Sequence, residues 1–340
     1  NFKINMESFL QVTYNANTSD FTSIEIKQGS LPLPPPPGMA YIKIAYAAIN
    51  PIDYMVLEGY MKSIWAMPLP FHPGYDFSGV IAALPEGDST DFKVGDEVFG
   101  VHWGVGRHDS VDHPDQPIGG TFAQYAAIPI RQLSKKPSKL SFELAAAVAL
   151  VGTTAYQALF DCLKVTAGQK ILILGGAGAV GGIAIQLAKH AGAWVATTAS
   201  TRNLKYISQF GADKVINYQE TQWNEDPELE GIHAVFDAVG EQGTFEKSKK
   251  ILQPAGRFVS IVSAEAGFDP TAHPPLAYAS MFGLYNSPAV QDKLAELFLA
   301  GKITCNIAET FDFTKEGVVA MFQSAKAAKS HGKNVLRVAT

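Results

Sequence analysis

The second half of the chain alternates between short apolar runs and segments with helical periodicity. The apolar runs are typical of buried strands and begin about every twenty residues, at Ile171, Trp194, Lys214, Ala234 and Arg257. Helical segments lie between them, at 203–210 before Gly211 and at 243–252 before Pro254. Strands that alternate with helices at this spacing predict βαβ crossovers and a doubly wound parallel sheet in an α/β fold.

The first 150 residues are β-rich by the same criterion. The segment 41–48, YIKIAYAA, alternates in the way that a half-exposed strand does. Further strands are expected at 79–84, 97–101 and 123–128.

The tail of the chain returns to a mixed pattern. Amphipathic helices are expected near 290–298 and 318–327, and an apolar run, VLRV, closes the chain at 335–338. We expect this last strand to complete the N-terminal sheet. The predicted domains are therefore 1–150 together with 289–340, and 151–288.

A glycine-rich turn follows the first strand of the α/β half. It matches the pattern G-x-G-x-x-G at Gly176, Gly178 and Gly181, and an apolar stripe predicts a helix from Val180 onward. Between a strand and a helix, such glycines let a pyrophosphate approach backbone N–H groups at the positive helix end. A Gly/Ala-rich segment can also simply pack closely, but the βα rhythm favours a dinucleotide site.

The residues at the end of the second strand indicate whether the site binds NADH or NADPH. An NAD site usually has an acidic residue there for the ribose hydroxyl, but the stretch 197–203, TTASTRN, has none. Ser200, Thr201 and Arg202 suit a 2′-phosphate, which arginine binds bidentately. Alternatively, Ser200 or Thr201 caps the next helix while Arg202 is solvated, and both interpretations can hold. The pattern favours NADPH over NADH.

Composition narrows the class of protein. A length of 340 residues favours two domains, and the net charge of -5 argues against a nucleic-acid surface. Two cysteines make no disulfide framework and fit a reducing, cytoplasmic setting.

The apolar run 171–188 contains five glycines in a strand–turn–helix pattern, so no membrane span is expected. The loop 103–118 is rich in His and Asp, but its Gly and Pro content makes a metal site there improbable.

A series of short motifs runs through nearly the whole chain. They are NPID at 50–53 with Gly59, HPGYDFSG at 72–79, VGD at 94–96, GGTFAQY at 119–125, GTTAY at 152–156, the glycine turn, GAD at 211–213, DAVG at 237–240 and GK at 332–333. In this order they resemble the medium-chain dehydrogenase/reductase superfamily, in its zinc-less, zeta-crystallin-like quinone oxidoreductase branch.

The resemblance implies a GroES-like β domain with the substrate site, a Rossmann domain, a cleft between them, and a homodimer joined through the Rossmann sheets. It implies that Asn50 meets the nicotinamide end and Thr154 its ribose. Further cofactor residues carried over are Gly178, Ala179 and Val180 at the pyrophosphate, Ser200, Thr201, Arg202 and Tyr218 at the adenosine phosphate, and Val239, Ile261, Lys333 and Asn334 along the groove.

Zinc-dependent relatives place a Cys where Asn50 stands and a His where Tyr75 stands, so the resemblance implies chemistry without a metal. The expected reaction is direct hydride transfer from NADPH to a quinone, with proximity and orientation as the main contribution. The resemblance marks Tyr60 as the hydrogen-bond donor or acid, with Tyr54 as second choice; each can also be a packing residue.

Two other functions stay open. One is NADPH-dependent reduction of the double bond of 2-alkenals or enones, because 201–203 and 211–213 also resemble plant alkenal reductases, although Met55 departs from their common Lys. The other is an NADPH-binding structural or regulatory protein without turnover.

Overall fold

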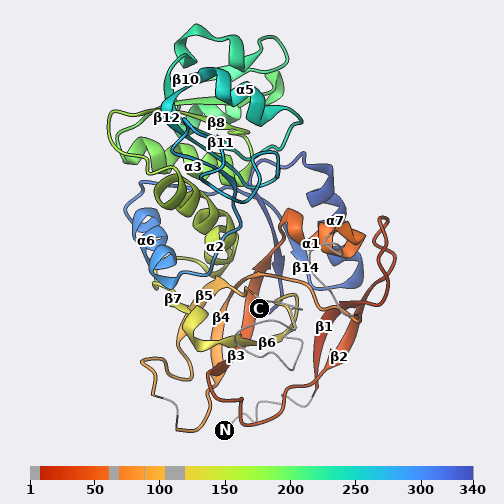
Figure 1. The fold of residues 1–340 in the computed structure, drawn as a ribbon. Coiled ribbons are helices and arrows are strands. Elements are labelled where there is room, and N and C mark those ends of the chain that lie inside the picture. The colour runs from red at the N-terminus through yellow and green to blue at the C-terminus, as the bar shows by residue number, and fades with distance from the viewer. Residues whose placement is uncertain (1–7, 61–68, 88, 104–118, 340) are drawn as a thin grey trace. The chain divides into compact units, whose positions relative to one another are not determined.

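The computed structural model describes residues 8–60, 69–87, 89–103 and 119–339. The chain divides into two compact units (Figure 1). The first unit comprises Asn1–Leu150, Asn286–Glu296 and Ile307–Thr340, and the second comprises Val151–Tyr285 and Leu297–Asn306.

A mixed β-sheet is the main element of the first unit. In the described part of the chain its strands follow the order β14-β15-β3-β4-β5-β7, and β6 pairs with β3. Their bounds are β3 Met39–Ala48, β4 Asp76–Ala83, β5 Glu97–Val101, β6 Tyr125–Pro129, β7 Ser134–Lys135, β14 Ile307–Asp312 and β15 Lys333–Arg337. A separate hairpin is formed by β1 (Phe9–Tyr14) and β2 (Ile24–Gly29).

The last strand pairs antiparallel with β3, which places Val335 opposite Ala48. This pairing confirms the expected return of the chain end to the N-terminal sheet. The helices of this part of the chain are α1 Pro51–Glu58, α2 Phe142–Tyr156, α6 Pro288–Leu299 and α7 Lys315–Ala327. Of these, α2 continues into the second unit, where it passes into a π-helix at Gln157–Cys162.

Six parallel strands form the sheet of the second unit in the order β10-β9-β8-β11-β12-β13. Their bounds are β8 Lys170–Leu174, β9 Trp194–Ala199, β10 Lys214–Asn217, β11 Ile232–Asp237, β12 Leu252–Ser260 and β13 Tyr278–Met281. The order reverses direction at β8, which is the topology of a dinucleotide-binding fold. The predicted doubly wound parallel sheet is confirmed.

Both faces of this sheet are buried. Leu172 and Leu174 of β8 belong to a core that contains Phe245 of helix α5 (Thr244–Ile251). Successive side chains of a strand point to opposite faces, and Ile171 and Ile173 are also fully buried. The second face is therefore covered too, and helix α3 (Ala179–His190) contacts β8 and β9 (Figure 1).

Several element boundaries differ from the prediction; for example, β4 begins at Asp76 instead of 79, and β6 spans Tyr125–Pro129 instead of 123–128. The runs from Ala234 and Arg257 end as strands at Asp237 and Ser260, two residues early, because hydrogen bonds to those two side chains turn the chain out of the ladder. The segment 203–210 is a short helix, α4 (Leu204–Ile207), flanked by 3₁₀ turns at Thr201–Asn203 and Ser208–Phe210. Its last turn tightens before Gly211, which has a positive φ of 78°.

Candidate functional site

The glycine turn between β8 and α3 is shaped by close approaches of the backbone. A Cβ atom at Gly176 would lie 2.2 Å from Thr197 Oγ1, and one at Gly181 would lie 2.2 Å from the carbonyl oxygen of Gly175. Neither position can hold a larger residue without moving its surroundings. These two glycines are explained by packing alone.

Gly178 differs from its two neighbours in the motif. A Cβ atom there would meet only the Gly175 carbonyl oxygen, at an ordinary contact distance of 3.4 Å. Gly178 is the N-cap of α3, with φ -72° and ψ 160°, so its backbone is open to any residue. Since packing does not require glycine here, the free space suits a ligand that approaches the backbone. Ala179 and Val180 open the helix behind it, where N–H groups have no intrahelical partner.

The end of β9 carries a buried hydroxyl without a partner. Ser200 is 6% exposed, and its Oγ makes no hydrogen bond to any residue that the structure describes. Its side chain does not cap the following turn. An unpaired buried hydroxyl costs about 1–3 kcal/mol, which a ligand oxygen can offset. The Ser200 side chain therefore does not supply the cap that the alternative interpretation assigned to Ser200 or Thr201, although Arg202 is exposed as that alternative expected.

The neighbour of Ser200 is held in place by residues at and after the end of β10. The Thr201 N–H donates to Gln219 Oε1 (2.9 Å), and Thr201 Oγ1 accepts from Asn217 Nδ2 (2.8 Å). Arg202 and Tyr218 are exposed at the same edge of the sheet, after β9 and β10. The end of β9 thus presents hydroxyls and a guanidinium, and residues 199–203 include no carboxylate.

On the other side of the glycine turn, β11 and β12 end beside each other. Val239 follows β11 and is 51% exposed, and a Cβ atom at Gly175 would lie 2.7 Å from its Cγ2 atom. Ile261 follows β12, is half-buried, and its N–H donates to the Asp237 carbonyl (3.1 Å). Thr154 of α2 is 5% exposed, and its Oγ1, like that of Ser200, is buried without a hydrogen-bond partner among the described residues.

Predicted residues of the first unit gather in a buried polar cluster. Lys333 Nζ donates to Asn50 Oδ1 (2.6 Å), to the Ile49 carbonyl (2.7 Å) and to Asp76 Oδ2 (3.1 Å). Asn50 Nδ2 donates to Asp76 Oδ2 (2.8 Å), and Asp76 Oδ1 accepts from the Leu150 N–H (2.7 Å). We call Asn50, Asp53, Asp76 and Lys333 the Lys333 cluster. All three ammonium hydrogens of Lys333 are used inside the protein.

Asp53 completes the Lys333 cluster. Its carboxylate accepts from the backbone N–H groups of Asn50 (2.8 Å) and Gly74 (3.1 Å). Burial raises the pKa of Asp53 to about 7, against the opposing effects of the Asn50 N–H and Lys333. Burial also raises the pKa of Asp76, opposed by Lys333 and Asn50. The cluster is therefore an internal charge network in which burial favours the protonated form of both carboxyl groups.

The other predicted residues of the first unit are Asn334, next to Lys333 in β15, and two tyrosines on and beyond α1. The N–H of Ile49 donates to the Asn334 carbonyl (3.2 Å), and Asn334 Nδ2 donates to Ser324 Oγ (3.0 Å). Asn334 Oδ1 is buried without a hydrogen-bond partner in the part of the chain that the structure describes. Tyr54 of α1 is half-buried, and burial raises its pKa. Tyr60, past the end of α1, is 68% exposed.

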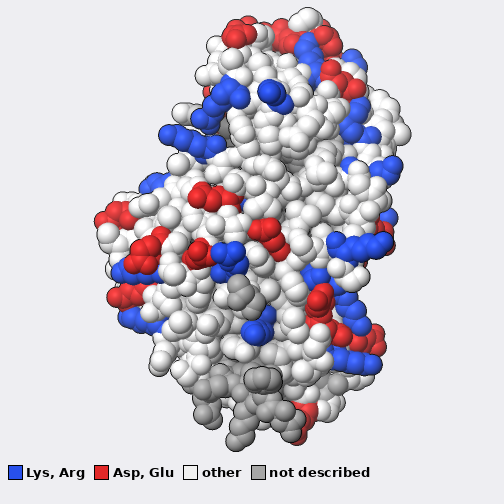
Figure 2. Space-filling view, turned by 180° about the vertical axis from the view of Figure 1, so that it is seen from behind, with Lys and Arg blue, Asp and Glu red and all other residues white. Residues whose placement is uncertain are grey.

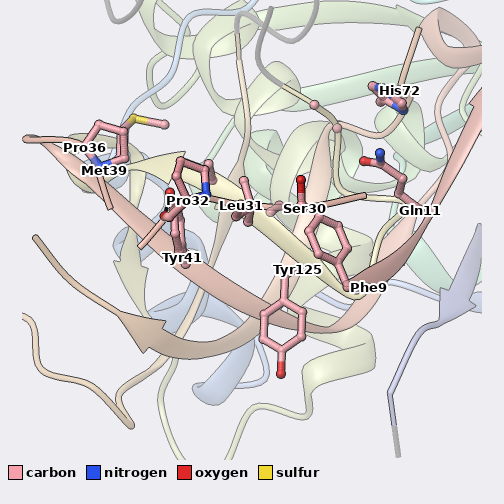
Figure 3. Close-up of a pocket in the computed structure, with 14 residues that line it drawn as sticks. Phe9, Gln11, Ser30, Leu31, Pro32, Pro36, Met39, Tyr41, His72 and Tyr125 are labelled. Carbon is pink, nitrogen blue, oxygen red and sulfur yellow. Dashed lines mark hydrogen bonds between the residues drawn. The ribbon is translucent and has the colours of Figure 1, made fainter. Parts of the chain in front are cut away.

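Figure 3 shows a cavity of about 270 Å³ in the first unit. It lies between the β1–β2 hairpin and strands β3 and β6, and its lining includes Phe9, Tyr41, Tyr125 and His72. Tyr41 Oη donates to the Pro32 carbonyl (2.6 Å), and His72 Nδ1 contacts the Val12 carbonyl oxygen (3.2 Å). No predicted catalytic or cofactor residue lines this cavity.

The structure thus gathers most of the predicted residues into two groups, one in each unit, while Thr154 of α2 belongs to neither. Asn50, Lys333 and Asn334 form one, with Tyr54 and Tyr60 on and beyond α1. The second group follows the carboxyl ends of β8 to β12. Sequence reasoning did not assign roles to Asp53, Asp76, Asp237 or Ser260, although the first three stand inside motifs that it quoted.

Within the described ranges, no group of three His, Cys, Asp or Glu side chains is placed to hold a metal ion. The His- and Asp-rich residues 104–118 lie outside those ranges. Among the described residues, one helical segment, Phe142–Cys162, is long and apolar enough to cross a membrane, but 78% of its apolar 18-residue window is buried inside the protein, so it gives little support to a span. Figure 2 shows acidic and basic side chains interspersed on one face.

Comparison with known proteins identifies the family. Residues 36–138 match the alcohol dehydrogenase GroES-like domain, and residues 179–283 match the zinc-binding dehydrogenase family. Over 298 residues the chain is 34% identical to 2-methylene-furan-3-one reductase of Solanum lycopersicum, covering 87% of this chain and 70% of that protein. The chain belongs to the medium-chain dehydrogenase/reductase family.

Two further relatives refine the position within the medium-chain dehydrogenase/reductase family. The chain is 36% identical over 225 residues to the chloroplastic NADPH-dependent alkenal/one oxidoreductase of Arabidopsis thaliana, covering 66% of this chain and 55% of that one. The structure of the quinone oxidoreductase from Coxiella burnetii matches with a TM-score of 0.80 and 29% identity, over 98% of this chain and all of that one. The chain is thus an NAD(P)-dependent oxidoreductase with GroES-like and Rossmann folds, as predicted.

Proposed function

We propose that this protein is an NADPH-dependent quinone oxidoreductase that transfers hydride without a metal. The observation that carries the cofactor assignment is the end of β9, where Ser200 Oγ is buried without a partner among the described residues and Arg202 beside it is exposed. A 2′-phosphate offers oxygens to both groups, whereas the 2′-hydroxyl of NADH would leave the guanidinium without an anion. The printed name of the Arabidopsis relative also specifies NADPH.

We infer the residues that would hold the cofactor from the geometry at the glycine turn and at the end of β9. The backbone at Gly178, Ala179 and Val180 would bind the pyrophosphate, and Ser200, Thr201 and Arg202 would bind the 2′-phosphate, with Tyr218 beside them. NADPH supplies a hydride when it is bound. The protein contributes binding and orientation, and these can supply several kcal/mol of the barrier reduction.

The electrophile is assigned to the quinones, because the match to the Coxiella quinone oxidoreductase extends over nearly the whole chain. Quinones are electron-poor and need little activation. We propose Tyr60 as the proton donor to the reduced oxygen, with Tyr54 as the second choice, since an exposed phenol can reach a bound acceptor.

A second candidate is reduction of the carbon–carbon double bond of enones and alkenals. It is favoured by the printed names of the tomato and Arabidopsis relatives. Incubating the protein with NADPH and matched panels of quinones and enals, and following the loss of NADPH absorbance, separates the two. Turnover of quinones alone supports the proposal, turnover of enals alone supports the second candidate, and tight NADPH binding without turnover supports a binding role.

The cofactor assignment has its own test, Arg202→Glu. We expect the affinity for NADPH to fall by roughly 10- to 100-fold, which is about 1.4–2.8 kcal/mol, while the affinity for NADH changes little. Lys205→Glu, three residues further on and equally exposed, is the matched control. Equal NADPH affinity in the two variants would show that Arg202 does not face the 2′-phosphate.

We also propose a homodimer, on the resemblance to the quinone oxidoreductase branch. Light scattering coupled to gel filtration measures its mass directly. A mass near that of one 36.5 kDa chain across micromolar concentrations would contradict the dimer.

A further inference from the structure

A single buried carboxylate joins the two loops that follow β11 and β12. Asp237 is the last residue of β11 and is 0% exposed. Its Oδ1 atom accepts from the N–H groups of Val239 (2.9 Å) and Gly240 (3.0 Å). Its Oδ2 atom accepts from Ser260 Oγ (2.8 Å). An ionised carboxylate has the acceptor sites for three such donors.

Ser260 links Asp237 to the loop that follows β12. It is the last residue of β12 and lies opposite Asp237 in the parallel ladder. Its Oγ atom donates to Asp237 and accepts from the N–H groups of Val262 (3.2 Å) and Ser263 (2.9 Å). Two backbone turns are thereby fixed to one carboxylate through one hydroxyl.

These loops present apolar side chains next to the glycine turn. A Cβ atom at Gly175 would come within 2.7 Å of Val239, and one at Gly240 within 2.5 Å of Val262. Val239 and Val262 nevertheless remain 51% and 48% exposed. Half-exposed valines held this closely against glycines form a shaped, partly apolar surface rather than a packed core.

The strand order indicates what this surface receives. A dinucleotide binds across the point where the strand order reverses, with its pyrophosphate at the turn after the first strand. In this sheet that strand is β8, with β9 on one side and β11 and β12 on the other. If the adenosine phosphate lies at the end of β9, the other nucleotide has to lie over the loops of β11 and β12.

We infer that Asp237 is a positioning residue, acting with Ser260, that holds the loops at Val239 and Val262 in the shape that receives the nicotinamide half of the cofactor. This inference rests on the proposed NADPH site. It assigns neither residue to the chemistry, because both are buried beneath the surface that they shape.

Two variants test the Asp237–Ser260 hydrogen bond separately from the stability of the fold. Ser260→Ala removes the hydroxyl that joins the loops. Asp237→Asn retains Oδ1 for Val239 and Gly240 but places an NH₂ group against Ser260 Oγ, which already accepts two N–H groups. Ser248→Ala, which removes a fully buried hydroxyl of α5 that donates to the Thr244 carbonyl (2.7 Å), is the matched control for serine. Asp213→Asn, before β10, is the control for aspartate.

The measurement is the dissociation constant of the full-length protein for NADPH and for adenosine 2′,5′-bisphosphate, which carries only the adenosine end. We expect Ser260→Ala and Asp237→Asn to weaken NADPH binding by roughly tenfold and to leave adenosine 2′,5′-bisphosphate binding within about twofold. The fluorescence of bound NADPH should also shift in these variants and not in the controls.

Any other result would contradict either the positioning role or the proposed NADPH site. Equal losses for both ligands would show that Asp237 and Ser260 only stabilise the second unit, and unchanged NADPH binding would show that the connection is not needed. Either result overturns the positioning role and leaves the NADPH site standing. If the wild-type protein binds neither ligand, the proposed function itself fails. Should Asp237→Asn not fold, Ser260→Ala alone decides.

Discussion

The Lys333 cluster and the carboxyl edge of the parallel sheet are both rich in polar groups, but they differ in how those groups are paired. In the cluster, the Lys333 ammonium uses all its hydrogens on protein acceptors, and Asn50 is 1% exposed. At the sheet edge, Ser200 Oγ is buried and unpaired among the described residues. Paired groups stabilise the fold, whereas an unpaired buried group calls for a further partner, such as a water molecule or a ligand. The family resemblance assigned both sets to the cofactor, whereas the residue pattern by itself assigned only the sheet edge.

The largest expected effect tests the Lys333 cluster, whose polar groups are paired inside the protein. Lys333→Met leaves Asp76 and Asp53 buried without their cation, and breaking a buried ion pair costs about 3–5 kcal/mol. Urea unfolding should show a loss of that size. Lys293→Met, which removes an exposed pair with Glu296, should cost about 0–1 kcal/mol. A Lys333 variant of normal stability that bound NADPH poorly would place Lys333 at the cofactor instead.

The second prediction concerns pH and Asp53. Because burial raises the pKa of Asp53 to about 7, well above its value near 4 in the unfolded chain, the folded state binds the extra proton. This contribution to stability is complete below about pH 4 and is lost as the pH rises through about 7. A shift of about three units corresponds to at most roughly 4 kcal/mol.

Asp53→Asn removes this titration. We expect the unfolding free energy of the variant to change less than that of the wild type between pH 5 and pH 8. The difference between the two curves isolates Asp53 from Asp76 and from other carboxyls. If the two curves run parallel, Asp53 is ionised throughout this range.

The third prediction contrasts two glycines of one motif. Gly181→Ala places a Cβ atom 2.2 Å from a backbone oxygen, so we expect a stability loss of about 1–3 kcal/mol. Gly178→Ala meets nothing closer than 3.4 Å, and its stability should stay within about 1 kcal/mol of the wild type. NADPH titration should nevertheless show weaker binding for Gly178→Ala. Unchanged binding there would mean that the pyrophosphate does not approach this backbone.

These contrasts also show how far the sequence can be read. The strands at 97–101 and 214–217 were predicted with their observed bounds, because short apolar runs there are flanked by turn residues. Helix α1 was not predicted, although Pro51 at its first position and Asp53 in its first turn are signals of a helix start.

The Lys333 cluster could not be predicted as a unit. Asn50 and Asp76 lie 283 and 257 residues from Lys333 along the chain, and only the pairing of β15 with β3 and of β3 with β4 brings them together. Likewise, the early ends of β11 and β12 depend on the Asp237–Ser260 contact, which apolar periodicity does not contain. Local patterns were sufficient to select the sheet edge as a candidate site, because the residues of the glycine turn are contiguous, as are residues 200–202.

The smallest expected effect is also the most direct test of the comparison. Ser200→Ala removes a buried hydroxyl that has no partner among the described residues, so the protein without cofactor should be as stable as the wild type or slightly more stable. If Ser200 faces the 2′-phosphate, NADPH affinity should still fall, by about tenfold, or 1.4 kcal/mol. A purely internal hydroxyl would give the opposite result, with lower stability and unchanged NADPH affinity. Thermal unfolding with and without NADPH measures both quantities in one experiment, since at a fixed ligand concentration the stabilisation by a bound ligand grows with the logarithm of its affinity. The smallest substitution in the set therefore separates a ligand-facing residue from a structural one.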